Sequence, residues 1–190
     1  DIFTISAGND VIADLETNDA IVVNDSTAQV TANNVSAFVA DSGTSSTGTV
    51  IINSASGGST ITMTDATSGI FTINGGSSGD TITGGGDADV IDGNGGDDDI
   101  TGGAGDDNLT GGSGNDTFRV DSGSDTIVDL GGTSGGDSDV LIVSSGATAT
   151  ISNVKSFTAG GTTANNSGTV EITTHTCLLY TSDAADEWLR

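Results

Sequence analysis

Residues 75–128 read GGSSGDTIT GGGDADVID GNGGDDDIT GGAGDDNLT GGSGNDTFR VDSGSDTIV when they are divided into frames of nine. The sixth position of every frame is an aspartate: Asp80, Asp89, Asp98, Asp107, Asp116 and Asp125. The eighth position is always a large apolar residue: Ile82, Ile91, Ile100, Leu109, Phe118 and Ile127. A pattern that keeps its phase over so many frames predicts a stack of repeated structural units.

The order of residues within a frame predicts a glycine turn followed by a short strand. Glycines at positions one, two and four let the backbone turn tightly and adopt positive φ. Positions seven to nine then form a strand whose central apolar side chain points inward. Two frames, about 18 residues, are expected to make one coil with two strands and two loops, so that loops two frames apart stack about 4.8 Å apart.

This stacking would bring the sixth-position aspartates of alternate frames together. Two carboxylates that are about 4.8 Å apart repel each other when nothing compensates their charge. Ca²⁺ is a hard cation that takes six to eight oxygen ligands, including carboxylates and backbone carbonyls. The spacing therefore predicts that hard cations with oxygen ligands, such as Ca²⁺, lie between the stacked aspartates.

The pattern G-G-x-G-x-D-x-U-x, in which U is a large apolar residue, resembles the RTX, or haemolysin-type, calcium-binding repeat. The resemblance implies an all-β fold over residues 75–128, a right-handed parallel β-roll. It also implies that each calcium site uses the sixth-position aspartates of one frame and of the frame two later. The resulting pairs are Asp80 with Asp98, Asp89 with Asp107, Asp98 with Asp116, and Asp107 with Asp125.

The resemblance adds backbone carbonyls to each site, from positions two and four of the earlier frame and one and three of the later. Carried over to this chain, these carbonyls belong to Gly76, Ser78, Gly85, Asp87, Gly93, Gly95, Gly102, Ala104, Gly111 and Ser113. Some frames depart from the pattern, because Ser78 and Asp87 replace the fourth-position glycine and Asn94 replaces a second-position glycine. The last frame begins with Val120 and Asp121, so the resemblance is weakest for the site that pairs Asp107 with Asp125.

The chain is strongly acidic and poor in material for a hydrophobic core. It has 27 acidic residues against three basic ones, a formal net charge of −24, 30 glycines and 4% aromatic residues. Such a charge repels nucleic acid and anionic membrane surfaces, and no apolar run is long enough to span a bilayer. Acids at variable positions, Asp92, Asp97, Asp99 and Asp106, are expected to form a solvated surface.

The small core predicts that folding depends on calcium. One inward side chain per frame cannot offset the conformational entropy of a glycine-rich chain, so ions that bind only the folded state must supply the difference. We expect residues 1–176 to be largely disordered without Ca²⁺ and to gain β structure when it is added. Mg²⁺ should substitute poorly because it requires a tighter octahedral shell.

The sequence also contains a longer repeat, since residues 1–52 resemble residues 116–172. DIFTISAGNDVIADL at residues 1–15 matches DTFRVDSGSDTIVDL at residues 116–130, and the match resumes at Asp19 and Asp139 after an insertion. The chain thus divides into residues 1–74, the end of an earlier block with a spacer; 75–128, the roll; and 129–176, a second spacer. The spacers alternate with period two, which predicts a continuing β-solenoid or, alternatively, a small β-sandwich.

Residues 177–190, CLLYTSDAADEWLR, differ from the rest of the chain. They contain the only cysteine, tyrosine and tryptophan and none of the 30 glycines. From Cys177 to Glu187 they resemble a conceptual translation of a sequencing adapter, so we predict an artefactual tail. Without it no cysteine remains for disulfides, and because the chain begins mid-pattern at Asp1, we expect its natural N-terminus to lie further upstream.

Signs of catalysis are weak, so we do not expect an enzyme. Ser77 lies in a formal G-x-S-x-G match, but a glycine loop follows it instead of a helix, and His175 is the only histidine. The leading hypothesis is a calcium-binding structural module of a secreted or cell-surface, bacterial repeat protein, such as an adhesin or surface-layer-like protein, with a possible glycan or surface partner. The alternative is a non-catalytic secretion and folding module of an extracellular protease, lipase or polysaccharide epimerase. Both hypotheses imply type I secretion of an unfolded chain directly to the outside.

Overall fold

The computed structural model describes residues 1–17, 19–131, 138–152, 164–165 and 169–173, and the regular structure of these residues is entirely β-strand. The strands are β1 (Ile2–Ile5), β2 (Asn9–Ile12), β3 (Ala20–Val23), β4 (Gln29–Val35), β5 (Ala37–Val39), β6 (Ser45–Ser46), β7 (Thr49–Ser54), β8 (Thr60–Thr62), β9 (Phe71–Asn74), β10 (Thr81–Thr83), β11 (Val90–Asp92), β12 (Asp99–Thr101), β13 (Asn108–Thr110), β14 (Thr117–Val120), β15 (Ser124–Ile127), β16 (Val140–Val143), β17 (Thr148–Ser152), β18 (Ala164–Asn165) and β19 (Thr169–Thr173). None of the described residues forms a helix able to cross a membrane.

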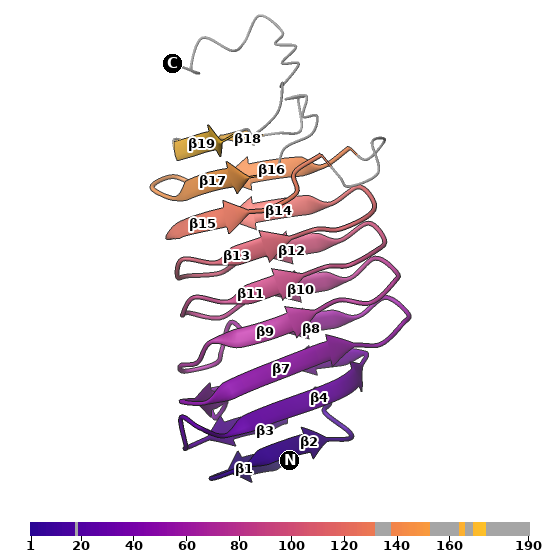
Figure 1. Ribbon diagram of the computed structural model, residues 1–190, viewed down its shortest axis with the longest axis vertical. Coiled ribbons are helices and arrows are strands. Elements are labelled where there is room, and N and C mark those ends of the chain that lie inside the picture. The colour runs from indigo at the N-terminus through magenta and orange to yellow at the C-terminus, as the bar shows by residue number, and fades with distance from the viewer. Residues whose placement is uncertain (18, 132–137, 153–163, 166–168, 174–190) are drawn as a thin grey trace, which may run out of the picture.

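The strands stack into one parallel β-solenoid, with the N-terminus at one end of the stack (Figure 1). From β7 onward, alternate strands along the chain belong to opposite sheets. One sheet has the order β19-β17-β15-β13-β11-β9-β7-β4-β2, and the facing sheet has the order β18-β16-β14-β12-β10-β8-β5. A three-stranded sheet, β1-β3-β6, lies at the N-terminal end. The all-β parallel roll expected from the sequence is confirmed.

The strand register confirms that two nine-residue frames make one coil. Thr81 in β10 pairs with Asp99 in β12, and Val90 in β11 pairs with Asn108 in β13. Each pair is separated by 18 residues along the chain. The sixth-position aspartates of the first five frames consequently lie directly before a strand, and Asp125 of the last frame lies in β15. Each lies at the same edge of the roll as the aspartate one coil later.

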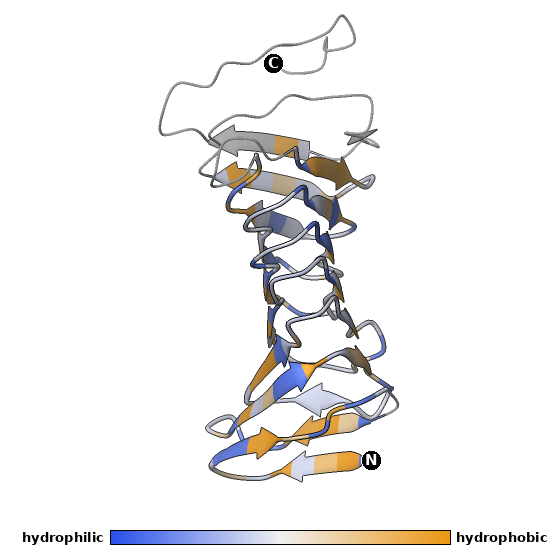
Figure 2. Cartoon of the chain, turned by 90° about the vertical axis from the view of Figure 1, so that its right-hand side faces the viewer, coloured by the Kyte–Doolittle hydropathy of each residue, from blue (hydrophilic) through white to orange (hydrophobic). Residues whose placement is uncertain are grey.

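The core of the roll is a single file of apolar side chains along each sheet. The eighth-position residues all point inward and are 0% exposed: Ile82, Ile91, Ile100, Leu109, Phe118 and Ile127. Each coil of the repeat block therefore contributes one side chain from each sheet to the core, as the sequence predicts. This core is narrow, and Figure 2 shows the block as the thinnest part of the molecule.

The spacers extend the same solenoid and do not form a sandwich. β8 and β9 pair in parallel with β10 and β11, and β14 and β15 pair in the same way with β16 and β17. The sheets thus continue across the expected boundaries at residues 74 and 128. Both spacer interpretations require period-two strands, and the sequence favours the solenoid because it would cap the open ends of the roll. The parallel pairing confirms the solenoid.

The N-terminal spacer has a broader core than the block. Its coil from β4 to β5 buries Val30, Ala32, Val35, Phe38 and Ala40, where a coil of the block buries two large apolar side chains. A ladder of amides also links three successive coils, since Asn53 donates to Asn33 and Asn74 donates to Asn53, each at 2.7 Å. The spacer therefore has its own sources of stability, which the block lacks.

Candidate metal centre

Two rows of buried aspartates run along the edges of the roll. The sixth-position aspartates are 3% exposed or less, although aspartate is rarely buried without a partner. In each row the backbone N–H of one aspartate donates to Oδ1 of the aspartate one coil later. These bonds join Asp80 to Asp98 at 2.7 Å, Asp89 to Asp107 at 2.7 Å, Asp98 to Asp116 at 2.9 Å, and Asp107 to Asp125 at 3.2 Å.

The rows continue beyond the nine-residue frames, which the sequence analysis missed. The N–H of Asp116 donates to Oδ1 of Asp139 at 2.9 Å, across 23 residues instead of 18. Asp129 accepts the N–H groups of Gly111 and Gly112 at 3.1 and 3.0 Å. The long repeat could have identified Asp139, because it aligns Asp139 with Asp19. Oδ1 of Asp19 accepts a hydrogen bond from the amino group of Asp1 at 2.6 Å, in the place equivalent to the bond between Asp116 and Asp139.

The second carboxylate oxygens of these aspartates are not equivalent. Oδ2 of Asp80 accepts the N–H of Gly76 at 2.7 Å, and Oδ2 of Asp89 accepts the N–H of Gly85 at 2.6 Å. Across the described part of the chain, three buried carboxylate oxygens have no hydrogen-bond partner: Oδ2 of Asp98, of Asp107 and of Asp125. A buried carboxylate oxygen without a partner costs free energy, so these three atoms require compensation.

Two of these oxygens converge above Gly102. A Cβ on Gly102 would collide with Oδ2 of Asp107 and would lie 2.9 Å from Oδ2 of Asp125. The first-position glycine therefore provides space for carboxylates, and it does not have positive φ, which the sequence analysis expected at positions one, two and four. Positive φ occurs at positions two and four, for example +102° at Gly103 and +116° at Gly105.

The carbonyls implied by the resemblance take part in the contacts between coils. Gly76 and Gly85 accept the N–H groups of Gly95 and Ala104, at 3.2 and 3.0 Å, and Ser113 accepts the N–H of Gly96 at 2.8 Å. The carbonyl oxygens of Gly93, Gly102 and Gly111 approach the first-position glycine of the preceding coil. The implied ligands thus lie in the loops beside the aspartate rows.

Burial raises the pKa of most of these carboxyls. It raises the pKa of Asp98 and of Asp125 to about 7, against the backbone N–H bonds that lower it, and the neighbouring aspartates add to the increase. For the same reason the pKa values of Asp89 and Asp116 rise to about 6, and those of Asp107 and Asp129 also rise. The ionised rows are therefore costly unless positive charge compensates them.

This donor set consists of oxygen and fits calcium. No three His, Cys, Asp or Glu side chains converge on one point among the residues outside the gaps, so a site must use pairs of carboxylates together with backbone carbonyls. Soft metals favour thiolates and imidazoles, whereas Ca²⁺ favours this mixture of carboxylate and carbonyl oxygens.

Comparison with protein families identifies the block. The family model of the RTX calcium-binding nonapeptide repeat (4 copies) matches residues 72–100 and 92–127. Residues 72–127 are RTX calcium-binding repeats. No curated protein and no solved structure matches the chain. The RTX block is a calcium-binding repeat module on a structural fold, and this fold is not a catalytic one.

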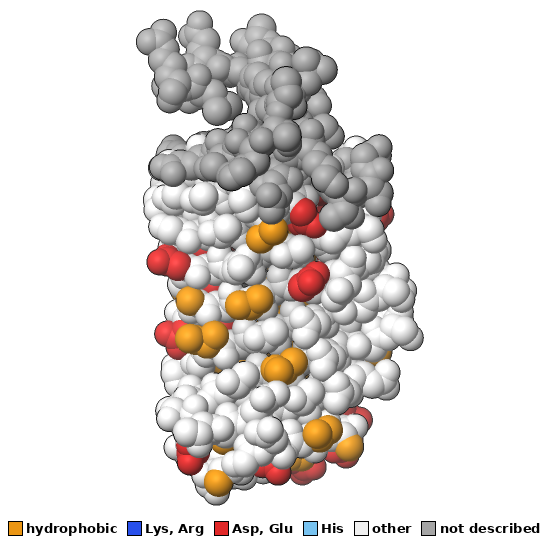
Figure 3. Space-filling model, in the orientation of Figure 1, with side chains coloured by type: hydrophobic (Ala, Val, Ile, Leu, Met, Phe, Trp, Pro, Cys, Tyr) orange, Lys and Arg blue, Asp and Glu red, His pale blue; other side chains and the backbone are white. Residues whose placement is uncertain are grey.

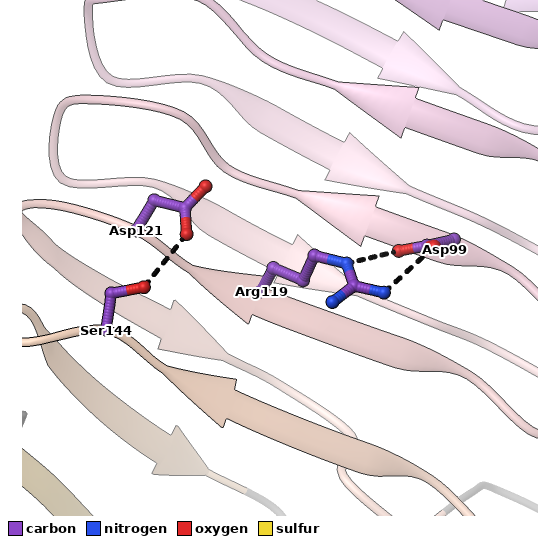
Figure 4. A network of polar contacts seen from close by, with 4 residues as sticks. All are labelled: Asp99, Arg119, Asp121 and Ser144. Atoms are coloured by element: carbon purple, nitrogen blue, oxygen red, sulfur yellow. Dashed lines mark hydrogen bonds and ion pairs between the residues drawn. The ribbon is translucent and has the colours of Figure 1, made fainter. Parts of the chain in front are cut away.

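The remaining acids of the RTX block are exposed or half-buried, and several of them bind neighbouring coils. Oδ1 of Asp97 accepts the N–H of Asn115 at 2.8 Å, and Oδ1 of Asp106 accepts the N–H of Ser124 at 2.9 Å. Asp99 forms a two-pronged ion pair with Arg119, at 3.0 and 3.2 Å, as Figure 4 shows. On the face in Figure 3, acidic side chains are scattered and the apolar spots are small and separate.

Of the two residues considered for catalysis, Ser77 is the one that the structure describes. The Ser77 hydroxyl is in an exposed loop, where it donates to the carbonyl of Ser56 at 3.4 Å. His175 and the tail at residues 177–190 lie outside the described residues.

We predict that acid stabilises the calcium-free fold. Burial raises the pKa values of Asp89, Asp98, Asp116 and Asp125 from 3.8 to about 6 or 7 in the folded state, so the folded state binds more protons between about pH 4 and pH 7. Stability must then fall as the pH rises through that window. Thermal unfolding in calcium-free buffer, followed by circular dichroism, should give a higher midpoint at pH 5 than at pH 8. A midpoint that rises with pH would contradict this assignment.

Proposed function

We propose that this chain is a calcium-binding structural module of a secreted or cell-surface repeat protein, which becomes ordered when it meets calcium outside the cell. The observation that carries the proposal is the set of buried carboxylate oxygens on Asp98, Asp107 and Asp125 that lack a hydrogen-bond partner within the described residues. Bound Ca²⁺ would supply the positive charge and the oxygen coordination that these atoms need. The proposed ligands are drawn from the sixth-position aspartates, in particular Asp98, Asp107 and Asp125, and from the loop carbonyls named above.

The long repeat supports a structural role in an array. The structure repeats as the sequence does: Gly8 and Gly123 occupy equivalent positions with φ of +84° and +88°. Leu15 and Leu130 are both buried at equivalent positions. A spacer that joins the RTX block without a break in its sheets suits a rigid repeat protein, such as an adhesin or surface-layer-like protein. Extracellular calcium modules work at 10⁻⁴–10⁻³ M affinity, which suits folding after export.

Calorimetric titration of the chain with CaCl₂ tests this proposal. We expect saturable binding of several Ca²⁺ ions per chain, with affinity in the micromolar to millimolar range. An equal concentration of MgCl₂ should bind much more weakly, because Mg²⁺ sheds its water reluctantly and requires octahedral geometry. Equal heats for both ions, or none for calcium, would refute a calcium-specific module.

A further inference from the structure

The loops of the RTX block have two conformations. In the loops that begin at residues 75 and 84, the second-position N–H donates to the aspartate of the same frame. In the loops that begin at residues 93, 102 and 111, positions two and four have positive φ: Asn94 and Gly96, Gly103 and Gly105, and Gly112 and Gly114. We call the first two loops closed and the other three open.

We propose that calcium binding is confined to residues 93–128, where Asp98 and Asp107 of two open loops and Asp125 of the last frame hold the ions. We call these three side chains the open carboxylates. Asp80 and Asp89 instead hold backbone N–H groups and need no calcium. This inference rests on the proposed function and specifies which of the repeated aspartates perform it.

Both oxygens of each closed carboxylate accept a backbone N–H group. Asp80 accepts the N–H of Ser59 at 2.6 Å on Oδ1 and the N–H of Gly76 at 2.7 Å on Oδ2. Asp89 accepts the N–H groups of Phe71 and Gly85 at 2.8 and 2.6 Å in the same arrangement. N–H donors on both oxygens stabilise a carboxylate without a metal. They also occupy the space in which a cation would approach.

The open carboxylates have one free oxygen each. Their Oδ1 atoms accept the N–H of the preceding coil, as in the closed frames, but their Oδ2 atoms have no hydrogen-bond partner among the described residues. At Gly102 two such oxygens, from Asp107 and Asp125, border the same space. The last frame, which departs most from the repeat pattern, thus supplies Asp125, whose Oδ2 lies beside the Oδ2 of Asp107.

The fourth position of the frame explains the two conformations. Gly96, Gly105 and Gly114 have φ between +106° and +130°, a region that side-chain-bearing residues rarely adopt. Ser78 and Asp87 occupy this position in the closed loops, and their side chains form hydrogen bonds with the preceding spacer coil. The Ser78 hydroxyl donates to the carbonyl of Ser56 at 3.0 Å, and Asp87 accepts the N–H of Gly69 at 2.8 Å.

Matched asparagine variants of the full chain test the proposal. Asp107→Asn keeps an oxygen for the Asp89 N–H but loses the charge, so calorimetry should show fewer ions or at least about tenfold weaker binding. Asp80→Asn leaves one of two N–H groups without an acceptor, so it should lower the thermal midpoint in calcium and leave the number of bound ions unchanged. Asp97→Asn, which retains its Oδ1 acceptor, should change neither quantity.

A variant that gains calcium sites provides a second test, because misfolding can reduce calcium binding but cannot increase it. The double variant Ser78→Gly with Asp87→Gly restores glycine at both fourth positions, so it should bind more calcium per chain than the unmodified protein. Unchanged stoichiometry in that variant, or equal calcium loss in Asp80→Asn and Asp107→Asn, would overturn the confinement of binding to residues 93–128. Absence of calcium binding by the unmodified chain would instead overturn the proposed function itself.

Discussion

Removal of calcium is expected to abolish much of the β structure, with the loss centred on residues 93–128. The coils there bury only two or three large apolar side chains each, and carboxylates whose Oδ2 lacks a hydrogen bond repel one another once the compensating charge is gone. Residues 20–74 should stay folded, because their coils bury more apolar surface and carry the Asn33–Asn53–Asn74 ladder. This expectation is narrower than disorder of residues 1–176, since the structure gives the spacer its own core.

Far-UV circular dichroism with chelator and then with millimolar calcium measures the total change, and hydrogen exchange with mass spectrometry locates it. Protection should be lost first in residues 93–128 and should return with calcium but not with magnesium. Identical spectra with and without calcium, or uniform loss of protection along the chain, would argue against this account.

The second large effect is expected for Gly103→Ala. Gly103 has φ of +102°, and a Cβ there would overlap the carbonyl oxygen of Gly85 in the preceding coil. A residue with a side chain pays about 1–2 kcal/mol in this region of φ, and overpacking against the backbone adds about 1–3 kcal/mol. We therefore expect a destabilisation of about 2–5 kcal/mol, or about 5–15 °C in the thermal midpoint for a chain of this size.

Gly86→Ala is the matched control for that substitution. Gly86 lies in the neighbouring loop without positive φ, and nothing in the described part of the chain lies within 4 Å of its potential Cβ. Thermal unfolding of both variants at saturating calcium should leave Gly86→Ala close to the unmodified chain. Equal thermal midpoints for the two variants would show that the close approach of Gly103 to the carbonyl of Gly85 does not exclude a side chain.

The periodic features of this molecule could be predicted from sequence. Aspartate and apolar residues at fixed positions specify the coil length, the inward side chains such as Ile100, and the row that contains Asp98. These predictions succeed because in a parallel stack sequence spacing translates directly into spatial spacing.

Features that depend on the direction of single peptides could not be predicted. Whether the N–H of Gly76 faces Asp80 depends on the backbone conformation of one loop, and Gly76 itself matches the repeat pattern. Asp139 was missed for a different reason, since the chain between β14 and β16 is longer than one standard coil and shifts it out of phase. In both cases the contact depends on geometry that a nine-residue period does not encode.

The parallel stacking of short coils also determines how the molecule would respond to tension. Backbone hydrogen bonds between coils run along the solenoid axis, so a pull on its two ends loads them in series. Opening one 18-residue coil exchanges about 4.8 Å of stack height for about 60 Å of extended chain. Such a solenoid can lengthen roughly tenfold, coil by coil, before the covalent chain bears the load. A calcium ion held between successive coils would act as a cross-link along the direction of pull, so the calcium concentration would control how readily the solenoid lengthens.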